Sequence, residues 1–301
     1  MYRTVQFALV VAMATLPARM IRAAPVPASG PDAPRVVVYP SAGQANDSRG
    51  NYYVSLLRLA LARSDAVYEV RPSTEATVTR RALVEMAAGR GIDVLWAPRV
   101  TTLDHDFLPV PIPLDHGILG WRIFLIDKRD SAVFAAIRSL EQLKAYSAGQ
   151  VGEWADTAIM RANGIPVVDT TLYENLFPML AAHRFSYLPR GIAEIDGEAR
   201  NYAALGLVIE PRLALHYPYC TCFYVRRQNR ELARQIETGL RRVLKDGSME
   251  ALFQQFNGPA IQRAALARRV VFELANPLAV SDQDAWQQRC SSSSSGIVPG
   301  R

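Results

Sequence analysis

The sequence is poor in the residues and motifs from which catalytic and metal centres are usually built. It has 3 cysteines and 4 histidines in 301 residues, and it contains no Gly-x-Ser-x-Gly elbow, P-loop or Gly-x-Gly-x-x-Gly fingerprint. His105 and His116 have aspartates nearby, but prolines between positions 109 and 113 rule out the shared helix that a zinc-binding histidine pair needs. We therefore expect no metal and no cofactor.

Long apolar runs are also scarce. One occupies residues 7–16, follows Arg3 and precedes a candidate cleavage site at residues 21–23. At roughly 10–12 residues it is too short to span a membrane, but it has the length of a signal-peptide core. The sequence predicts a secretory signal peptide over residues 1–23, a periplasmic mature protein and no mature membrane span. The proline-rich stretch 24–34 is predicted to be disordered.

A large excess of one charge is missing as well. The chain has 34 Lys and Arg against 28 Asp and Glu, a net charge of +6. Cutting after Ala23 would remove three arginines and no acid, which lowers the net charge to +3. The remaining basic residues are interleaved with apolar ones, so nucleic acid is excluded as a partner. With 50% hydrophobic and 21% charged residues, most of the chain is expected to fold.

The cysteines are odd in number, so at least one thiol stays unpaired in an oxidising compartment. Cys220 and Cys222 lie on one face of a predicted strand, where a bridge between them would strain the backbone. We expect buried free thiols. Cys290 opens a serine-rich tail, and residues 289–301 are predicted to be disordered.

Apart from these ends, short β-branched runs alternate with stretches of helical periodicity. This alternation predicts an α/β fold with open, mostly parallel sheets covered on both faces. The expected strands are 35–39, 92–96, 121–127, 166–168, 185–188, 205–209 and 222–225, with helices over 52–61, 153–163, 173–180 and 232–247.

Two proline-rich stretches, at 109–120 and 211–218, are each followed by an extended apolar segment. Two such crossings are typical of one domain inserted into another. We predict an outer lobe from residues 35–120 and 216–288, an inserted lobe at 121–215, and hinges near Gly120 and His216.

Three local stretches carry a resemblance to a known family: Ser-Leu-Glu-Gln-Leu-Lys at 139–144, Tyr-Glu-Asn-Leu at 173–176 and Phe-Tyr-Val-Arg-Arg at 223–227. In this order the chain resembles bacterial extracellular solute-binding proteins of family 3, over about residues 35–275. The resemblance implies a two-lobed, Venus-flytrap fold of the type II periplasmic-binding kind. It also implies capture of a small polar ligand by lobe closure, for amino-acid transport by an ABC transporter or for a membrane sensor. We expect a monomer.

The resemblance further implies a ligand between the lobes. From the outer lobe, Tyr39 and Trp96 are candidates for stacking on it, and Arg99 for clamping a carboxylate. The family usually has a Thr-rich turn ending in Glu-Arg here, whereas this chain has Thr-Thr-Leu-Asp-His at 101–105. Only Arg99 can then replace the missing arginine.

Candidates from the inserted lobe lie in segments that resemble the family's binding loops: Gln150, Trp154, Thr157, Tyr173 and Arg190. Arg190 occupies a position where the family often has an acid for an α-amino group. A cation there predicts an anionic or carboxylate-bearing ligand, held by Arg99 and Arg190 from opposite sides of the cleft.

An enzyme on the same scaffold is the alternative, similar to the periplasmic cyclohexadienyl dehydratases. Such a lyase needs a general acid in the cleft. Asp104, His105 or Glu194 would have to supply it, and nothing in the sequence fixes one of them there.

Overall fold

The computed structural model describes residues 34–41, 50–77 and 79–279, together with Trp286, Cys290 and Ile297. The predicted signal peptide lies outside the described residues. So do nearly all of the proline-rich stretch and most of the C-terminal tail. None of the described helices is both long and apolar enough to cross a membrane.

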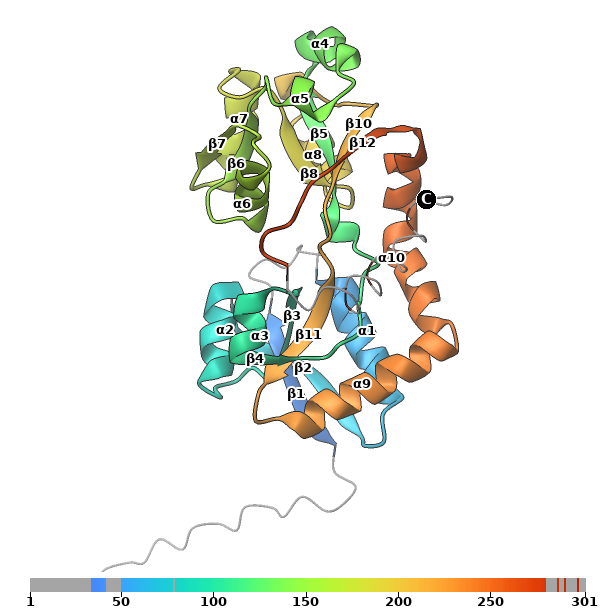
Figure 1. Ribbon diagram of the computed structural model, residues 1–301. Coiled ribbons are helices and arrows are strands. Elements are labelled where there is room, and N and C mark those ends of the chain that lie inside the picture. The colour runs from blue at the N-terminus through green and yellow to red at the C-terminus, as the bar shows by residue number, and fades with distance from the viewer. Residues whose placement is uncertain are drawn as a thin grey trace, which may run out of the picture. The chain divides into compact units, whose positions relative to one another are not determined.

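Strands and helices alternate along most of the described chain (Figure 1). The strands are β1 Arg35–Ser41, β2 Tyr68–Ala76, β3 Val94–Pro98, β4 Phe107–Pro109, β5 Trp121–Asp127, β6 Ala148–Val151, β7 Val167–Thr170, β8 Leu188–Gly191, β9 Leu207–Ile209, β10 Leu213–His216, β11 Thr221–Arg226 and β12 Val270–Glu273. The α-helices are α1 Asn51–Ala62, α2 Thr79–Ala87, α3 Thr101–Asp106, α4 Ser131–Ala136, α5 Leu140–Leu143, α6 Ala155–Ala162, α7 Leu176–Ala181, α8 Ile195–Asn201, α9 Arg230–Lys245 and α10 Ser248–Ala264. Short 3-10 turns are η1 Ile118–Gly120, η2 Lys128–Asp130, η3 Tyr173–Asn175, η4 Ala203–Leu205 and η5 Leu266–Arg268.

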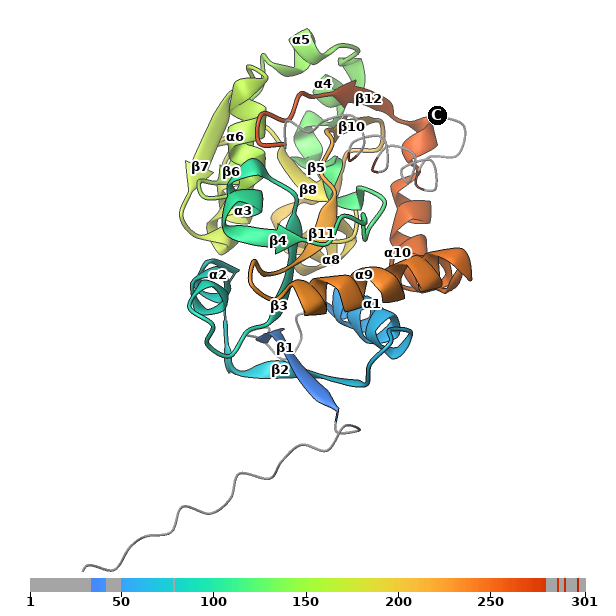
Figure 2. The same cartoon turned by 60° about the horizontal axis from the view of Figure 1, so that its bottom comes forward.

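The first lobe consists of the sheets β1-β2 and β3-β11-β4 and of helices α1 to α3 and α9 (Figure 1). Helix α9 is amphipathic and packs its apolar side against α1. The two backbones approach closely at Gly239, where an added Cβ would lie 1.9 Å from the carbonyl oxygen of Ala60. Figure 2 shows α9 and α1 side by side.

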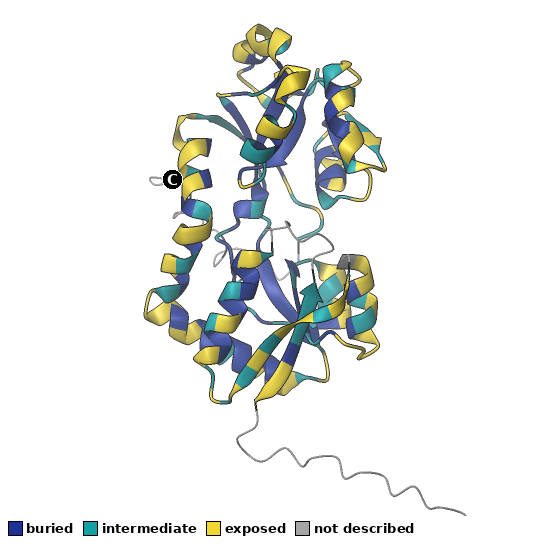
Figure 3. Ribbon diagram, turned by 180° about the vertical axis from the view of Figure 1, so that it is seen from behind, coloured by how far each residue is buried: buried dark blue, intermediate teal, exposed yellow. Residues whose placement is uncertain are grey.

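The second lobe consists of the sheet β12-β10-β5-β8, in which β9 also pairs with β5, of the β6-β7 pair and of helices α4 to α8. Every residue of β5 is buried, including Arg122 and Asp127, which fits its place between β10 and β8 in the sheet. Figure 3 shows the central strands of both lobes mostly in the colour of buried residues. Strand β12 pairs in parallel with β10, Leu213 opposite Val270. Residues 270–273, which the sequence placed in the outer lobe, therefore belong to the second-lobe sheet.

The sheets are mixed, not mostly parallel as the sequence predicted. Among the described strands, three pairs are parallel and five antiparallel. The antiparallel pairs all include β5 or β11. Strand β5 begins where the chain enters the second lobe, and β11 begins where the chain returns to the first. Both are antiparallel to neighbouring strands of their lobe, β5 to β8 and β11 to β3.

The expectation of buried free thiols is confirmed for Cys222 and wrong for Cys220. Cys220 and Cys290 form a disulfide, and Cys222 is free and buried. The sequence gives no sign of this bridge, because Cys290 opens the serine-rich tail that is predicted to be disordered. Cys290 is in fact buried in an apolar cluster of the first lobe, and Ile297 is buried in a cluster that contains residues of both lobes.

Candidate functional site

A cavity of about 860 Å³ is lined by residues of both lobes. Most of its wall comes from the end of β1, the start of α1 and the end of β3. Glu194 contributes from the turn before α8, Leu119 from the first crossing and Phe256 from α10. Cavities of this size commonly bind small molecules.

Aromatic rings form part of the first-lobe wall. The ring of Tyr53 stacks on Trp96, with centroids 5.5 Å apart and 16° between the planes, and the Tyr39 ring lies 6.3 Å from Trp96. Gly50 allows the start of α1 to approach, because a Cβ there would lie 2.9 Å from Cζ2 of Trp96. The wall therefore offers aromatic surface to an apolar or cationic part of a ligand.

The cavity side of α1 carries a polar stripe. Asn51, Ser55 and Arg58 line the cavity at helical spacing, while the leucines of this helix face the core. Arg58 is exposed, and within the described chain its guanidinium has no hydrogen bond or ion pair. It is therefore available to an anionic group such as a carboxylate.

A second cavity, of about 250 Å³, adjoins the first. Both are lined by Asn51, Tyr53, Leu119, Glu194 and Phe256.

Asp115 lines this second cavity only, and it is fully buried. It accepts hydrogen bonds from the Tyr53 hydroxyl (2.8 Å) and from the amides of Gly117 and Thr221. Burial raises its pKa in spite of these bonds. Asp115 thus joins the first crossing to α1 and β11.

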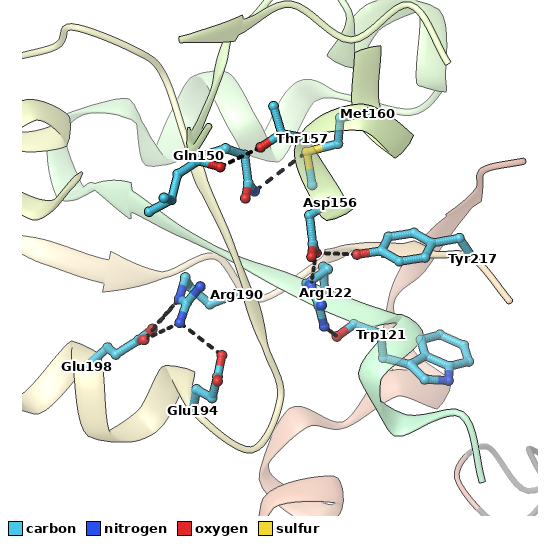
Figure 4. Close-up of polar contacts among 11 residues, drawn as sticks. Trp121, Arg122, Gln150, Asp156, Thr157, Met160, Arg190, Glu194, Glu198 and Tyr217 are labelled. Carbon is cyan, nitrogen blue, oxygen red and sulfur yellow. Dashed lines mark hydrogen bonds and ion pairs between the residues drawn. The ribbon is translucent and has the colours of Figure 1, made fainter. Parts of the chain in front are cut away.

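On the second-lobe side, Arg122 of β5 is paired with a buried carboxylate (Figure 4). Its Nε donates to Asp156 Oδ1 at 2.5 Å, and the Tyr217 hydroxyl donates to the same oxygen. Burial opposes ionisation of Asp156, but the charge and hydrogen bond of Arg122 outweigh it, so the pKa of Asp156 lies below its usual value. This cluster ties α6 to β5 and to the second crossing.

Arg190 of β8 is paired even more completely. Its Nε and Nη2 donate to Glu198 at 2.7–2.9 Å, and Nη2 also donates to Glu194 at 2.9 Å. The guanidinium carbon lies 4.7 Å from the Trp154 ring and 5.4 Å from the Tyr173 ring, and the Tyr173 hydroxyl donates to Glu198. Arg190 is buried and serves as the centre of a structural cluster.

Glu194 differs from the other carboxylates of this region because it lines both cavities. Its side chain is 32% exposed, whereas that of Glu198 is 8% exposed. Arg122 and Arg190 are buried beside three carboxylates, Asp156, Glu194 and Glu198, so this group of side chains carries one negative charge in excess. Of the three carboxylates, Glu194 is the one that lines the cavities.

The structure brings together only part of the predicted site. Tyr39 and Trp96 line the larger cavity. The other predicted residues line neither cavity: Arg99, Gln150, Trp154, Thr157, Tyr173 and Arg190. Gln150 is fully buried with its Nε2 on the Met160 sulfur, and the Thr157 hydroxyl donates to the carbonyl of Val151.

Arg99 is also engaged elsewhere. Its Nη2 lies 2.7 Å from Asp104 Oδ2, and its guanidinium carbon lies 5.0 Å from the ring of Trp286. The Tyr224 hydroxyl donates to the other oxygen of Asp104. Arg99 and Arg190 would each have to give up a carboxylate partner before they could hold an anionic ligand.

Sequence reasoning missed Tyr53, Arg58 and Phe256, and it considered Glu194 only as a catalytic acid. The stripe of Asn51, Ser55 and Arg58 on an otherwise apolar helix was a usable signal for the first-lobe wall. No comparable signal exists for Phe256, because α10 was not predicted. Within the described residues, no group of three or more His, Cys, Asp or Glu side chains could hold a metal ion.

No protein-family model matches the chain, and no curated protein sequence matches it significantly. Solved structures do match. An ancestral arginine-binding protein bound to arginine is 18% identical, with a TM-score of 0.52 over 73% of this chain and 97% of the other. A structure from a study of glutathione import through GshT and a cystine ABC importer of Streptococcus mutans is 12% identical, with a TM-score of 0.54 over 75% and 95%.

A double mutant of the BvgS VFT2 domain from Bordetella pertussis is 16% identical, with a TM-score of 0.53 over 74% of this chain and 92% of the other. The chain has the two-lobed fold of periplasmic binding proteins. In open α/β sheets, the crevice beyond the carboxyl ends of the strands commonly binds ligands, and the larger cavity lies at the ends of β1 and β3.

Proposed function

We propose that the chain is a solute-binding protein of the family 3 type, which captures a small polar, carboxylate-bearing ligand by closure of its two lobes. The observation that carries this proposal is the 860 Å³ cavity, which is lined by Arg58, without a partner in the described chain, and by aromatic rings of one lobe, together with Glu194 of the other. Residues 1–23 direct export to the periplasm. The captured ligand passes to an ABC-transporter permease or is reported to a membrane sensor.

The charges at the cavity define the ligand further. Arg58 receives a carboxylate, Glu194 receives a positively charged nitrogen, and Tyr39 and Trp96 contact the part between them. Such a ligand is amphoteric, in contrast to the purely anionic one that Arg99 and Arg190 suggested. Neutral sugars and dicarboxylates should bind more weakly than zwitterions.

A thermal-shift screen tests the proposal. The panel contains basic, neutral and acidic amino acids, dicarboxylates and neutral sugars, added to the mature chain. A ligand at 100 times its dissociation constant stabilises the folded state by about 2.7 kcal/mol. A shift with a zwitterion that disappears in both Arg58→Ala and Glu194→Gln supports the site. The absence of a shift with every compound, or equal shifts in these variants, would contradict it.

A lyase remains the second candidate because one of its three acids is well placed. Glu194 lines both cavities, whereas Asp104 is paired with Arg99 and His105 is exposed beside Asp106. Release of carbon dioxide from a carboxylated cyclohexadiene by the wild-type chain, abolished in Glu194→Gln, would support the enzyme. Unchanged substrate after prolonged incubation would leave the binding function.

A further inference from the structure

The smaller cavity, of about 250 Å³, lies below the roughly 300–1,000 Å³ that pockets for drug-sized ligands occupy. It shares Asn51 and Glu194 with the larger cavity, whereas Arg58 lines the larger cavity only. A ligand whose carboxylate binds Arg58 therefore reaches the smaller cavity with a different part of the molecule. The chemistry of that part follows from the side chains that line the smaller cavity.

Apolar side chains enter this wall from three parts of the chain. Ile118 and Leu119 come from the first crossing, Ile192 from the turn after β8, and Phe256 from α10. The Phe256 ring lies 6.0 Å from the Tyr52 ring, with 62° between the planes, and the residue is still 40% exposed. Phe256 thus keeps apolar surface that a ligand can cover.

The buried polar groups of the smaller cavity already have partners. Asp115 is fully buried and accepts hydrogen bonds from the Tyr53 hydroxyl and from two backbone amides. The Tyr52 hydroxyl donates to a backbone carbonyl of the first crossing, and Arg122 is paired with Asp156. A charged ligand group that entered this part of the cavity would lose its hydration and find these charges engaged by protein groups. An apolar group has no such cost.

We propose that the smaller cavity is a specificity pocket for the side chain of the amphoteric ligand, and that the preferred solutes are amino acids with an apolar side chain. The inference rests on the proposed function, because it takes Arg58 and Glu194 as the partners of the carboxylate and the ammonium group. Since Glu194 lines both cavities, the α-carbon of the ligand lies at their junction. The carboxylate then extends toward Arg58 in the larger cavity and the side chain into the smaller one. Phe256 contacts that side chain and determines the specificity.

The test is isothermal titration of the mature chain with alanine, 2-aminobutyrate, norvaline and norleucine, a series in which each member adds one methylene. Each methylene that enters the pocket should tighten binding about fourfold, so norleucine should bind about 60-fold more tightly than alanine. Lysine and glutamate, which carry a charge at the end of the side chain, should bind at least about tenfold more weakly than norleucine. A preference for lysine would overturn the proposal, because the ligand would then reach Asp115. A preference for glutamate would overturn it as well and assign the pocket to Arg122.

Two variants locate the effect in the pocket. Phe256→Ala should weaken the binding of norleucine at least about tenfold more than that of alanine, because only the longer side chain reaches the ring. Ala193 is exposed and lines only the smaller cavity, so Ala193→Phe fills the pocket and should show the same selective loss. Leu244→Ala is the matched control, since Leu244 is 48% exposed on α9 and lines neither cavity. Equal losses for alanine and norleucine in the two pocket variants would overturn the proposal.

Failure of this inference is distinguishable from failure of the proposed function. Affinities that are lost in Arg58→Ala but do not depend on side-chain length would overturn the specificity pocket and leave the proposed function intact. No detectable binding of any amino acid in the series would overturn both.

Discussion

The arginines on the two sides of the cavities have opposite environments. Arg122 and Arg190 of the second lobe are buried, and each is bonded to a carboxylate of a neighbouring helix. Arg58 of the first lobe is exposed and has no partner within the described chain. The same side chain therefore holds a lobe together on one side and is available to a ligand on the other. The presence of a nearby acid in the fold, and not the residue type, makes this difference.

Removal of the Arg122 partner should have the largest effect on stability. Asp156→Asn leaves a buried guanidinium without its countercharge, which typically costs about 3–5 kcal/mol of unfolding free energy. Tyr217→Phe removes only the hydroxyl that donates to Asp156 and should cost about 1–2 kcal/mol. Urea unfolding of both variants measures the difference. A smaller loss in Asp156→Asn than in Tyr217→Phe would show that Arg122 finds another partner.

Substitutions of Glu194 and Glu198, the two glutamates that accept hydrogen bonds from Arg190, should differ in their effect on stability. Glu198→Gln removes a carboxylate that accepts from both Nε and Nη2, at a cost of about 1.5–3 kcal/mol. Glu194→Gln should cost less than about 1 kcal/mol, because that side chain is partly exposed and Arg190 keeps Glu198. Ligand binding should follow the opposite order. Equal losses of stability would mean that Glu194 is as structural as Glu198.

Acid should weaken the second lobe through Asp156. Its pKa in the folded chain lies below the value of about 3.9 expected when unfolded, so its ionised form stabilises the fold at neutral pH. That contribution is retained above about pH 4 and is lost as the pH falls through the folded pKa. The stability difference between wild type and Asp156→Asn, followed by urea unfolding from pH 7 to 3, should therefore shrink below pH 4. A constant difference over this range would contradict the ion pair.

Arg58→Ala should have the smallest effect on stability and a large one on binding. An exposed side chain that has no partner among the described residues should contribute within about 0.5 kcal/mol to the free energy of unfolding. Loss of a charge-assisted contact of about 1.5–3 kcal/mol should weaken binding of the best zwitterion from the screen by about 10-fold or more. Arg63→Ala is the matched control, because Arg63 ends the same helix, pairs with Asp246 and lines neither cavity. Comparable affinities in the two variants would remove Arg58 from the site.

Much of the fold was predictable because its central elements have clear periodicity. The predicted strand 121–127 coincides with β5, and the helix predicted at 52–61 lies within α1. Strand β12 was missed because its four residues carry no periodic signal, and its pairing with β10 depends on the distant fold. Tyr39 and Trp96, which line the larger cavity, could be chosen as candidates from their positions at the ends of predicted strands. The arginines could not be assigned, since a single sequence does not show that Asp104 and Glu198 neutralise Arg99 and Arg190.

The late position of β12 in the chain also affects folding during synthesis. Until it emerges, β10 is the open edge of the second-lobe sheet, with Leu213, Ala214 and Leu215 uncovered, although all three are fully buried in the finished chain. At about 5–20 residues per second, a ribosome needs about 3–11 seconds to pass from β10 to the end of β12. During that time the edge is open to pairing with another nascent copy. A premature stop between α9 and β12 should therefore produce an aggregating fragment, and delivery of the whole chain before folding would avoid that risk.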